Sequence, residues 1–251
     1  IAPGEYTETA TVALKTYVAV EGSGQGVTTI TCACGGADYD ASSATVSVGD
    51  IVAEIRHLTI NNTGGDSVSF GVWTEDVVDG SVSMSDVTAT GTGGTYTYGV
   101  RNESSSPSMM NVTATATGGT FSRGVYNSLS SSPSMMNVTA TATGGTYSYG
   151  VYNNSSSPSM MDVTATGTGG TNTRGVYNYD SSSPSMTNVT ATGTGGTGDN
   201  YGVYNIDSSS PSMTNVTATG TGGTGDNYGV YNIDSSSPSM TNVTATGTGG
   251  T

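Results

Sequence analysis

The sequence repeats with a period of 25 to 28 residues from residue 71 to its end. A Gly-Val pair recurs at this spacing, and so does the valine of a second motif, (Asn/Asp)-Val-Thr-Ala-Thr. The pairs begin at Gly71, Gly99, Gly124, Gly150, Gly175, Gly202 and Gly229, and the second valines are Val87, Val112, Val138, Val163, Val189, Val216 and Val243. Because two separate anchors share one period, we predict a stack of equal units, each of which contacts its neighbours.

Each unit is predicted to contain three short strands. In the last unit these cover 228–231, 239–241 and 243–246, with a loop over 235–238 and a tight corner at Asn242. Thr, Val and Tyr favour strands, whereas the recurring Gly pair and Pro disfavour helix. Asn tolerates the left-handed backbone that a tight corner needs.

These features predict an all-β protein, a parallel β-solenoid with one unit per coil. Equivalent inward residues should then form ladders of Val, Met and Ala along the stack, for example Val151, Met160, Val163 and Ala165 in one coil. A thin core of this kind reconciles order with a hydrophobic content of only 33%. The alternative, a disordered Thr/Ser/Gly stalk, leaves the ladders unexplained.

We divide the chain into irregular first coils, 1–70, and a regular array, 71–251, within one continuous solenoid. Segments 1–8, 18–24 and 28–30 resemble the first coils of pectate-lyase-like right-handed β-helices, and 58–62 resembles a later coil. The array is similar to β-helix repeats of bacterial and archaeal surface proteins. This resemblance implies a right-handed coil. We expect about ten coils, which gives a rod roughly 45–50 Å long at the usual strand spacing. The fold hosts enzymes, adhesins and inert spacers alike.

Charge and hydropathy exclude two classes of function. The net charge is −14, with 19 acidic residues and five Lys or Arg, which argues against nucleic-acid binding because phosphates need neutralisation. No run of about 18 apolar residues is present to span a membrane. Since the chain starts at Ile1 without an initiator Met, we expect a processed chain or a fragment.

Catalytic residues are not predicted. His57 is the single histidine and has no evident partner in sequence, and the acidic residues of the array recur from coil to coil. A β-helix glycosidase needs paired carboxylates at one unique place. We therefore expect a protein that is not an enzyme.

Three polar features have alternative interpretations. Asp207 and Asp234 occupy equivalent loop positions and are weak candidates for Ca²⁺, which favours carboxylate oxygens; otherwise they are solvated, and no cofactor is expected. Cys32 and Cys34 are either a tight disulfide or two inert thiols. The Asn-Val-Thr asparagines are either glycosylation sites or corner residues whose amides hydrogen-bond along the stack.

An aromatic column follows the Gly-Val valines by one residue, so it should point away from the core. Its members are Trp73, Tyr126, Tyr152, Tyr177, Tyr204 and Tyr231, with Arg101 in the same column. Such a surface column could bind sugars, could pack against another solenoid, or could only stiffen its face through cross-strand pairs.

Near-identical coils favour a structural role. We expect an extracellular or cell-surface protein, a subunit of a filament or array that assembles with itself end to end or side by side. We find no obvious polar cap at either end of the repeat array. The alternative is an adhesin or carbohydrate-binding solenoid with a polysaccharide partner; a polysaccharide lyase or hydrolase is the weaker choice.

Overall fold

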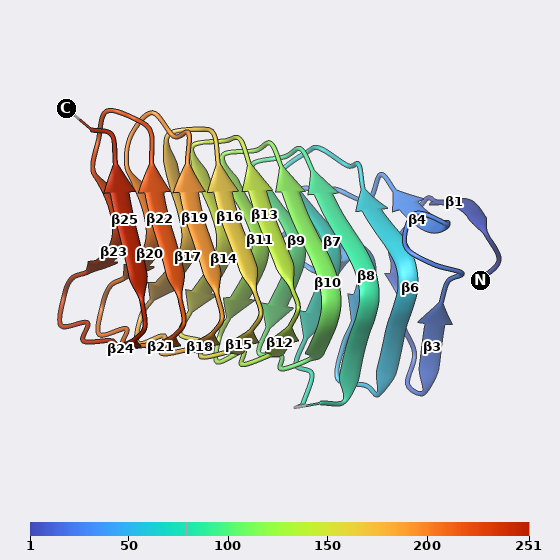
Figure 1. Ribbon diagram of the computed structural model, residues 1–251. Helices are drawn as coiled ribbons and strands as arrows, with labels where there is room; N and C mark the ends of the chain where they lie inside the picture. Colours follow the sequence, from blue (N-terminus) through green and yellow to red (C-terminus); the bar gives the residue numbers. More distant parts are fainter. Residues whose placement is uncertain (79, 251) are drawn as a thin grey trace.

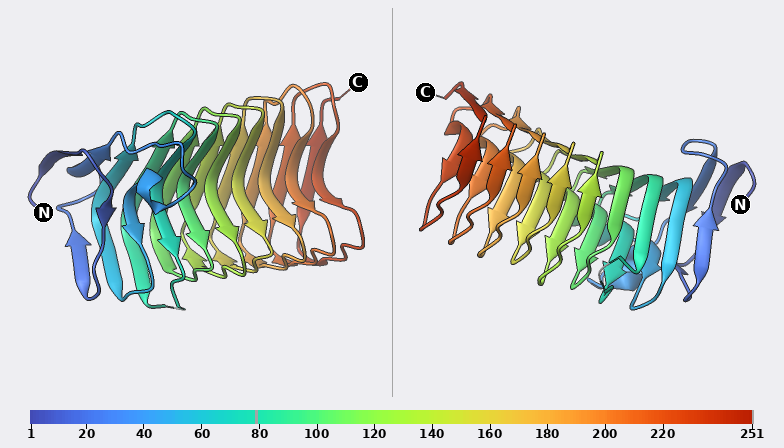
Figure 2. Two further views of the ribbon diagram at one scale, coloured as in Figure 1. Left: turned by 180° about the vertical axis from the view of Figure 1, so that it is seen from behind. Right: turned by 60° about the horizontal axis from the view of Figure 1, so that its bottom comes forward.

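The chain folds into a parallel β-solenoid, seen in a computed structural model that describes residues 1–78 and 80–250 (Figure 1). Its coils stack in one row, and two parallel sheets run the length of the stack (Figure 2). Among the described residues the one helical element is a 3₁₀ turn, η1 (Ala41–Ser43). The predicted all-β fold is therefore confirmed. The described residues include no helix long and apolar enough to cross a bilayer.

The first sheet has sixteen strands and the second has nine. The first contains β1 (Gly4–Glu8), β3 (Val18–Glu21), β4 (Thr28–Cys32), β6 (Ala53–Asn62), β8 (Val82–Thr92), β10 (Ser108–Thr117), β12 (Ser134–Met136), β13 (Thr139–Thr143), β15 (Ser159–Met161), β16 (Thr164–Thr168), β18 (Ser185–Thr187), β19 (Thr190–Thr194), β21 (Ser212–Thr214), β22 (Thr217–Thr221), β24 (Ser239–Thr241) and β25 (Thr244–Thr248). The second contains β2 (Val12–Ala13), β5 (Ala44–Val48), β7 (Val68–Glu75), β9 (Tyr96–Glu103), β11 (Phe121–Ser128), β14 (Tyr147–Asn154), β17 (Asn172–Tyr179), β20 (Asn200–Asn205) and β23 (Asn227–Asn232).

The nine strands of the second sheet correspond to about nine turns, close to the ten expected. From β11 onward each coil has the three predicted strands. In the coils before it, β6, β8 and β10 run through the corner as single long strands, so those coils have two.

The predicted ladders form the core between the sheets. Val151 and Val176 are 0% exposed and Met160 is 1% exposed, whereas Tyr152 on the outer side is 9% exposed. The inward and outward faces are therefore those that the sequence predicted.

The glycine of each Gly-Val pair lets the two sheets touch. A Cβ added to Gly150 would lie 2.4 Å from the backbone N of Thr166 in the facing sheet, and Gly124 and Gly175 meet Thr141 and Thr192 in the same way. No side chain fits between these backbones. The solenoid is consequently thin at this position, and the facing strands support each other directly.

A ladder of asparagine amides runs inside the solenoid at the end of the second-sheet strands. In each step the Nδ2 of one Asn donates to the Oδ1 of the equivalent Asn in the next coil, over 2.7–2.8 Å. The ladder consists of Asn102, Asn127, Asn153, Asn178, Asn205 and Asn232, and all but the last are 0% exposed. These bonds satisfy buried polar groups and fix the register of the coils.

A second, exposed ladder follows the corner of the first sheet. Asn137, Asn188, Asn215 and Asn242 have φ of 53° to 55°, the left-handed conformation that the sequence predicted for this corner. Their amides bond from coil to coil, for example Asn242 Nδ2 to Asn215 Oδ1 at 2.7 Å. These asparagines therefore form the coil-to-coil hydrogen bonds that were one of the two alternatives for them.

Candidate functional site

Two long aromatic columns cover the outer face of the nine-stranded sheet, beside a shorter stack of Tyr96, Phe121 and Tyr147. The predicted column lies there, opposite the valine ladder. A second column beside it was not predicted, and its members are Phe70, Tyr98, Arg123, Tyr149, Arg174, Tyr201 and Tyr228. Together we call them the aromatic face.

Sequence alternation missed the second column because the pleat changes phase at the glycine. Tyr98 and Val100 are two residues apart, which in a regular strand puts both side chains on one face. Instead Tyr98 belongs to the outer cluster and Val100 to the core. The pairing between neighbouring strands passes over Gly99, so the alternation restarts after it. The signal that could have found the column is the Tyr or Arg two residues before each valine.

Three arginines are inserted among the rings. The guanidinium of Arg101 lies 4.4 Å from the ring centroids of both Tyr39 and Trp73 and pairs with Glu103 at 2.7 Å. Arg123 is 4.9 Å from the ring of Tyr126 and donates to the Tyr98 hydroxyl. These positions allow cation–π attraction, which strengthens when the groups are desolvated.

Arg174 repeats this arrangement two coils further on. Its guanidinium lies 4.4 Å from the ring of Tyr177 and 4.6 Å from that of Tyr204, and it donates to the Tyr149 hydroxyl. Arginine and tyrosine thus alternate along part of the second column, so that each guanidinium is placed among rings.

The aromatic face is less exposed than the sequence predicted. Trp73 is 1% exposed, and Tyr126 and Tyr152 are each 9% exposed. Tyr39, in the segment after the Cys32–Cys34 disulfide, packs edge-on against Phe70 and Trp73 with centroids 5.5 and 6.2 Å away. The N-terminal part of the column is therefore covered by this segment and by its own neighbours.

Ring stacking also occupies the faces that a sugar would use. Tyr152 and Tyr177 are 9° from parallel with centroids 4.7 Å apart, and Tyr177 and Tyr204 are 10° apart at 5.2 Å. Each ring face is thus turned toward the next coil and only ring edges point outward. This geometry favours the stiffening role of the aromatic column over sugar binding.

Burial on the aromatic face raises the pKa of several tyrosines, including Tyr98, Tyr149 and Tyr152. In unfolded chains tyrosine ionises near pH 10. Above that pH the unfolded chain loses protons that the folded chain keeps, so folding stability is intact below about pH 10 and falls as the pH rises. Each such tyrosine then contributes a loss of about 1.4 kcal/mol per pH unit.

We therefore expect cooperative alkaline unfolding. Tyrosinate absorbance and far-ultraviolet circular dichroism should change together above pH 10, whereas in denaturant the tyrosines should titrate near their ordinary value. Full ionisation of the tyrosines with the β-signal unchanged would contradict the packing described here.

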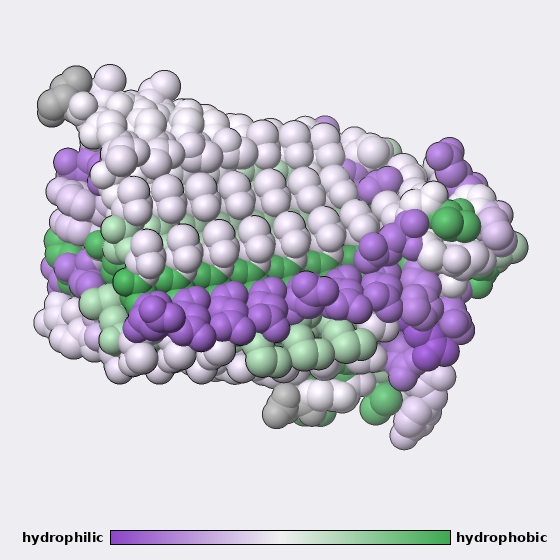
Figure 3. Space-filling model, viewed as in Figure 1, coloured by the Kyte–Doolittle hydropathy of each residue, from purple (hydrophilic) through white to green (hydrophobic). Residues whose placement is uncertain are grey.

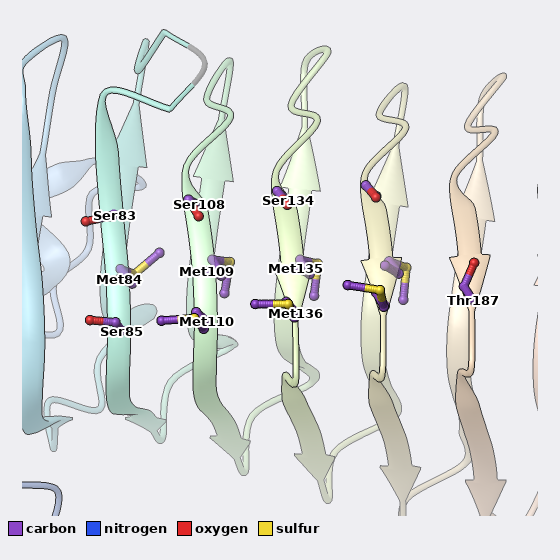
Figure 4. Close-up of a pocket in the computed structure, with 13 residues that line it drawn as sticks. Ser83, Met84, Ser85, Ser108, Met109, Met110, Ser134, Met135, Met136 and Thr187 are labelled. Carbon is purple, nitrogen blue, oxygen red and sulfur yellow. The ribbon is translucent and has the colours of Figure 1, made fainter.

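A groove lies on the outer face of the first sheet, just before the corner, with a volume of about 340 Å³. Serine and methionine columns line it, and Met110 and Met136 lie on its outer side while Met109 and Met135 point inward (Figure 4). The lining residues are Ser, Met and Thr. They supply no carboxylate or imidazole to the groove for acid–base chemistry.

The remaining candidates are dispersed. Asp207 and Asp234 lie in loops with φ of 53° and 52°. In the part of the chain that the structure describes, no group of three or more His, Cys, Asp or Glu side chains could hold a metal ion. His57 occupies the corner position of its coil, with φ of 56°, and its Nδ1 lies 3.3 Å from Asp86 Oδ2. Cys32 and Cys34 form a disulfide, which selects one of the two alternatives left open for them.

The fold defines the chain as a parallel β-solenoid. No protein-family profile and no curated protein matches. Among solved structures, the mannuronan C-5 epimerase A-module of Azotobacter vinelandii is 15% identical with a TM-score of 0.48, covering 98% of this chain and 86% of that one. A pectin methylesterase from Yersinia enterocolitica is 12% identical with a TM-score of 0.48, covering 96% of this chain and 75% of that one.

A third similar structure is the catalytic domain of an α-1,3-glucanase, 12% identical with a TM-score of 0.48. It covers 96% of this chain, which spans 53% of the glucanase domain. At this low identity and with TM-scores below 0.5, these likenesses assign neither a family nor a reaction to this chain.

Proposed function

We propose that this chain is a rigid structural rod of the cell exterior, a subunit of a surface filament or array, and not an enzyme. The observation that carries the proposal is the recurrence of the same bonds in successive coils. The buried asparagine ladder continues through six coils with nearly equal lengths. A catalytic site requires a departure from this uniformity at one place, whereas a rod requires that every coil be alike.

The disulfide supports an exterior location. Cys32 and Cys34 are bonded to each other, and disulfides persist in oxidising compartments. The bonded pair also anchors the start of the segment that carries Tyr39 over the aromatic face.

We further propose that the rods associate with one another. Parallel strands present the same backbone edge at every cross-section of the stack, so a coil of one subunit has the shape to pair with a coil of another. The net charge of −14 opposes side-by-side packing, and Ca²⁺ at the loops of Asp207 and Asp234 would weaken that repulsion.

Sedimentation velocity and electron microscopy over a range of protein concentrations, with and without Ca²⁺, test the association. We expect rods that lengthen or bundle as concentration rises, with more association in Ca²⁺. Single rods at all concentrations in Ca²⁺ would contradict assembly and leave a monomeric stalk. Globular or flexible particles would contradict the rod itself.

A further inference from the structure

Three straight columns of threonine cover the outer face of the first sheet after the corner. The Thr-Ala-Thr-(Ala/Gly)-Thr segment of each coil pairs in register with the next. The columns are Thr88, Thr113, Thr139, Thr164, Thr190, Thr217 and Thr244; Thr90, Thr115, Thr141, Thr166, Thr192, Thr219 and Thr246; and Thr92, Thr117, Thr143, Thr168, Thr194, Thr221 and Thr248. None of these residues is buried. Figure 3 shows these uncharged residues as straight, pale rows across the strands.

The threonine face is a two-dimensional lattice. Neighbouring strands lie about 4.8 Å apart, and side chains two residues apart on one strand lie about 6.7 Å apart. The first spacing is close to the repeat of hexagonal ice along its a axis, and the second is slightly shorter than the repeat along its c axis. A water lattice can therefore follow the columns over several coils.

The backbone under the middle column is held directly by the facing sheet. The Cβ sites of Gly150, Gly175 and Gly202 would lie 2.3–2.4 Å from the backbone N of the middle-column threonines opposite them. Alanine and glycine are the inward residues between the threonines, and Ala140, Ala165 and Ala191 are 0% exposed. Small inward residues let the two sheets approach closely here, and the amide ladders fix the register of the coils.

The side chains have the chemistry that ordered water requires. Threonine is stiff at χ1, and its hydroxyl both donates and accepts while its methyl group orders water around it. Within the described residues, the one side-chain hydrogen bond found between members of the three threonine columns joins Thr194 and Thr221 at 3.0 Å. The outward column before the corner differs, because it changes from Ser85 through three methionines to threonine. Threonine is thus kept in every coil of the threonine face, as it also is in the Gly-Gly-Thr loop that follows, whereas the outward position before the corner varies.

We propose that the threonine face binds ice. The ligand is the surface of an ice crystal, which the columns meet with an uncharged, regularly spaced array of hydroxyl and methyl groups. This function is independent of the rod role, since a single rod suffices for it.

The test measures thermal hysteresis and inhibition of ice recrystallisation with the whole chain. The variant Thr166→Tyr places a large side chain in the centre of the middle column and should abolish most of the hysteresis. The matched control is Met136→Tyr, which adds a ring to an outward position on the other side of the corner and should leave hysteresis unchanged. Circular dichroism and sedimentation show whether each variant keeps the fold.

A second variant, Thr166→Val, keeps the methyl shape without the hydroxyl, and it should retain part of the activity. The proposal is overturned if the wild-type chain shows no more hysteresis than a non-binding protein of equal osmolality. It is also overturned if folded Thr166→Tyr retains full activity. Loss of self-association in Thr166→Tyr, with no ice activity in the wild type, would assign the face to a second copy of the chain instead.

Discussion

Replacing Gly150 by alanine is expected to push the two sheets apart and to destabilise the solenoid by more than about 3 kcal/mol. The new methyl carbon would lie 2.4 Å from Thr166 N and 2.7 Å from both Ala165 C and Gly175 O. All three are backbone atoms in paired strands, so none can move without loss of sheet hydrogen bonds. Chemical denaturation followed by circular dichroism measures the effect.

Gly49→Ala is the matched control for this variant. Its added Cβ meets nothing within 4 Å, so the change should stay within about 0.5 kcal/mol of the wild type. Equal stability of the two variants would mean that the sheets do not approach as closely as described.

Replacing Asn153 by leucine should cost about 2–6 kcal/mol, because it interrupts the inner ladder in the middle. Asn153 is 0% exposed, accepts from Asn127 Nδ2 at 2.8 Å and donates to Asn178 Oδ1 at 2.8 Å. Leucine leaves the Nδ2 of Asn127 and the Oδ1 of Asn178 buried without their ladder bonds. Hydrogen exchange should show the loss of protection centred on the coils of β11, β14 and β17.

Asn215→Gly tests the same number of amide bonds in the exposed corner ladder. Asn215 donates to Asn188 and accepts from Asn242, but water can replace both bonds. Glycine also tolerates its φ of 54°. We expect a cost of less than about 1 kcal/mol; a cost as large as that of Asn153→Leu would show that burial does not set the value of these ladders.

The repeat period predicted the coils and the residues of the core because equal units impose equal positions. Val151 and Met160 could be assigned to the inside from the period alone. The corner at Asn242 could be assigned because a left-handed backbone limits the residue types. Each of these inferences depends on one local rule applied in every coil.

The inner asparagine ladder and the second aromatic column were missed for related reasons. The predicted strand 228–231 stops before Asn232, the equivalent of Asn153, although alternation from Val151 places Asn153 inward with the valine. Tyr149 is also two residues from Val151 but faces outward, because the intervening glycine shifts the pleat. Only the contact between Gly150 and the facing sheet reveals that shift, and this contact is a property of the tertiary structure.

The two amide ladders have opposite electrical direction. Inside, each Nδ2 donates toward the C-terminal coil, as Asn153 does to Asn178. At the corner the Asn–Asn bonds run the other way, as from Asn242 to Asn215. A peptide-like amide carries a dipole of about 3.5 D, and a head-to-tail row of amides adds these moments along the stack. The two antiparallel rows therefore largely cancel, so that lengthening the rod by further coils adds little net moment along its axis.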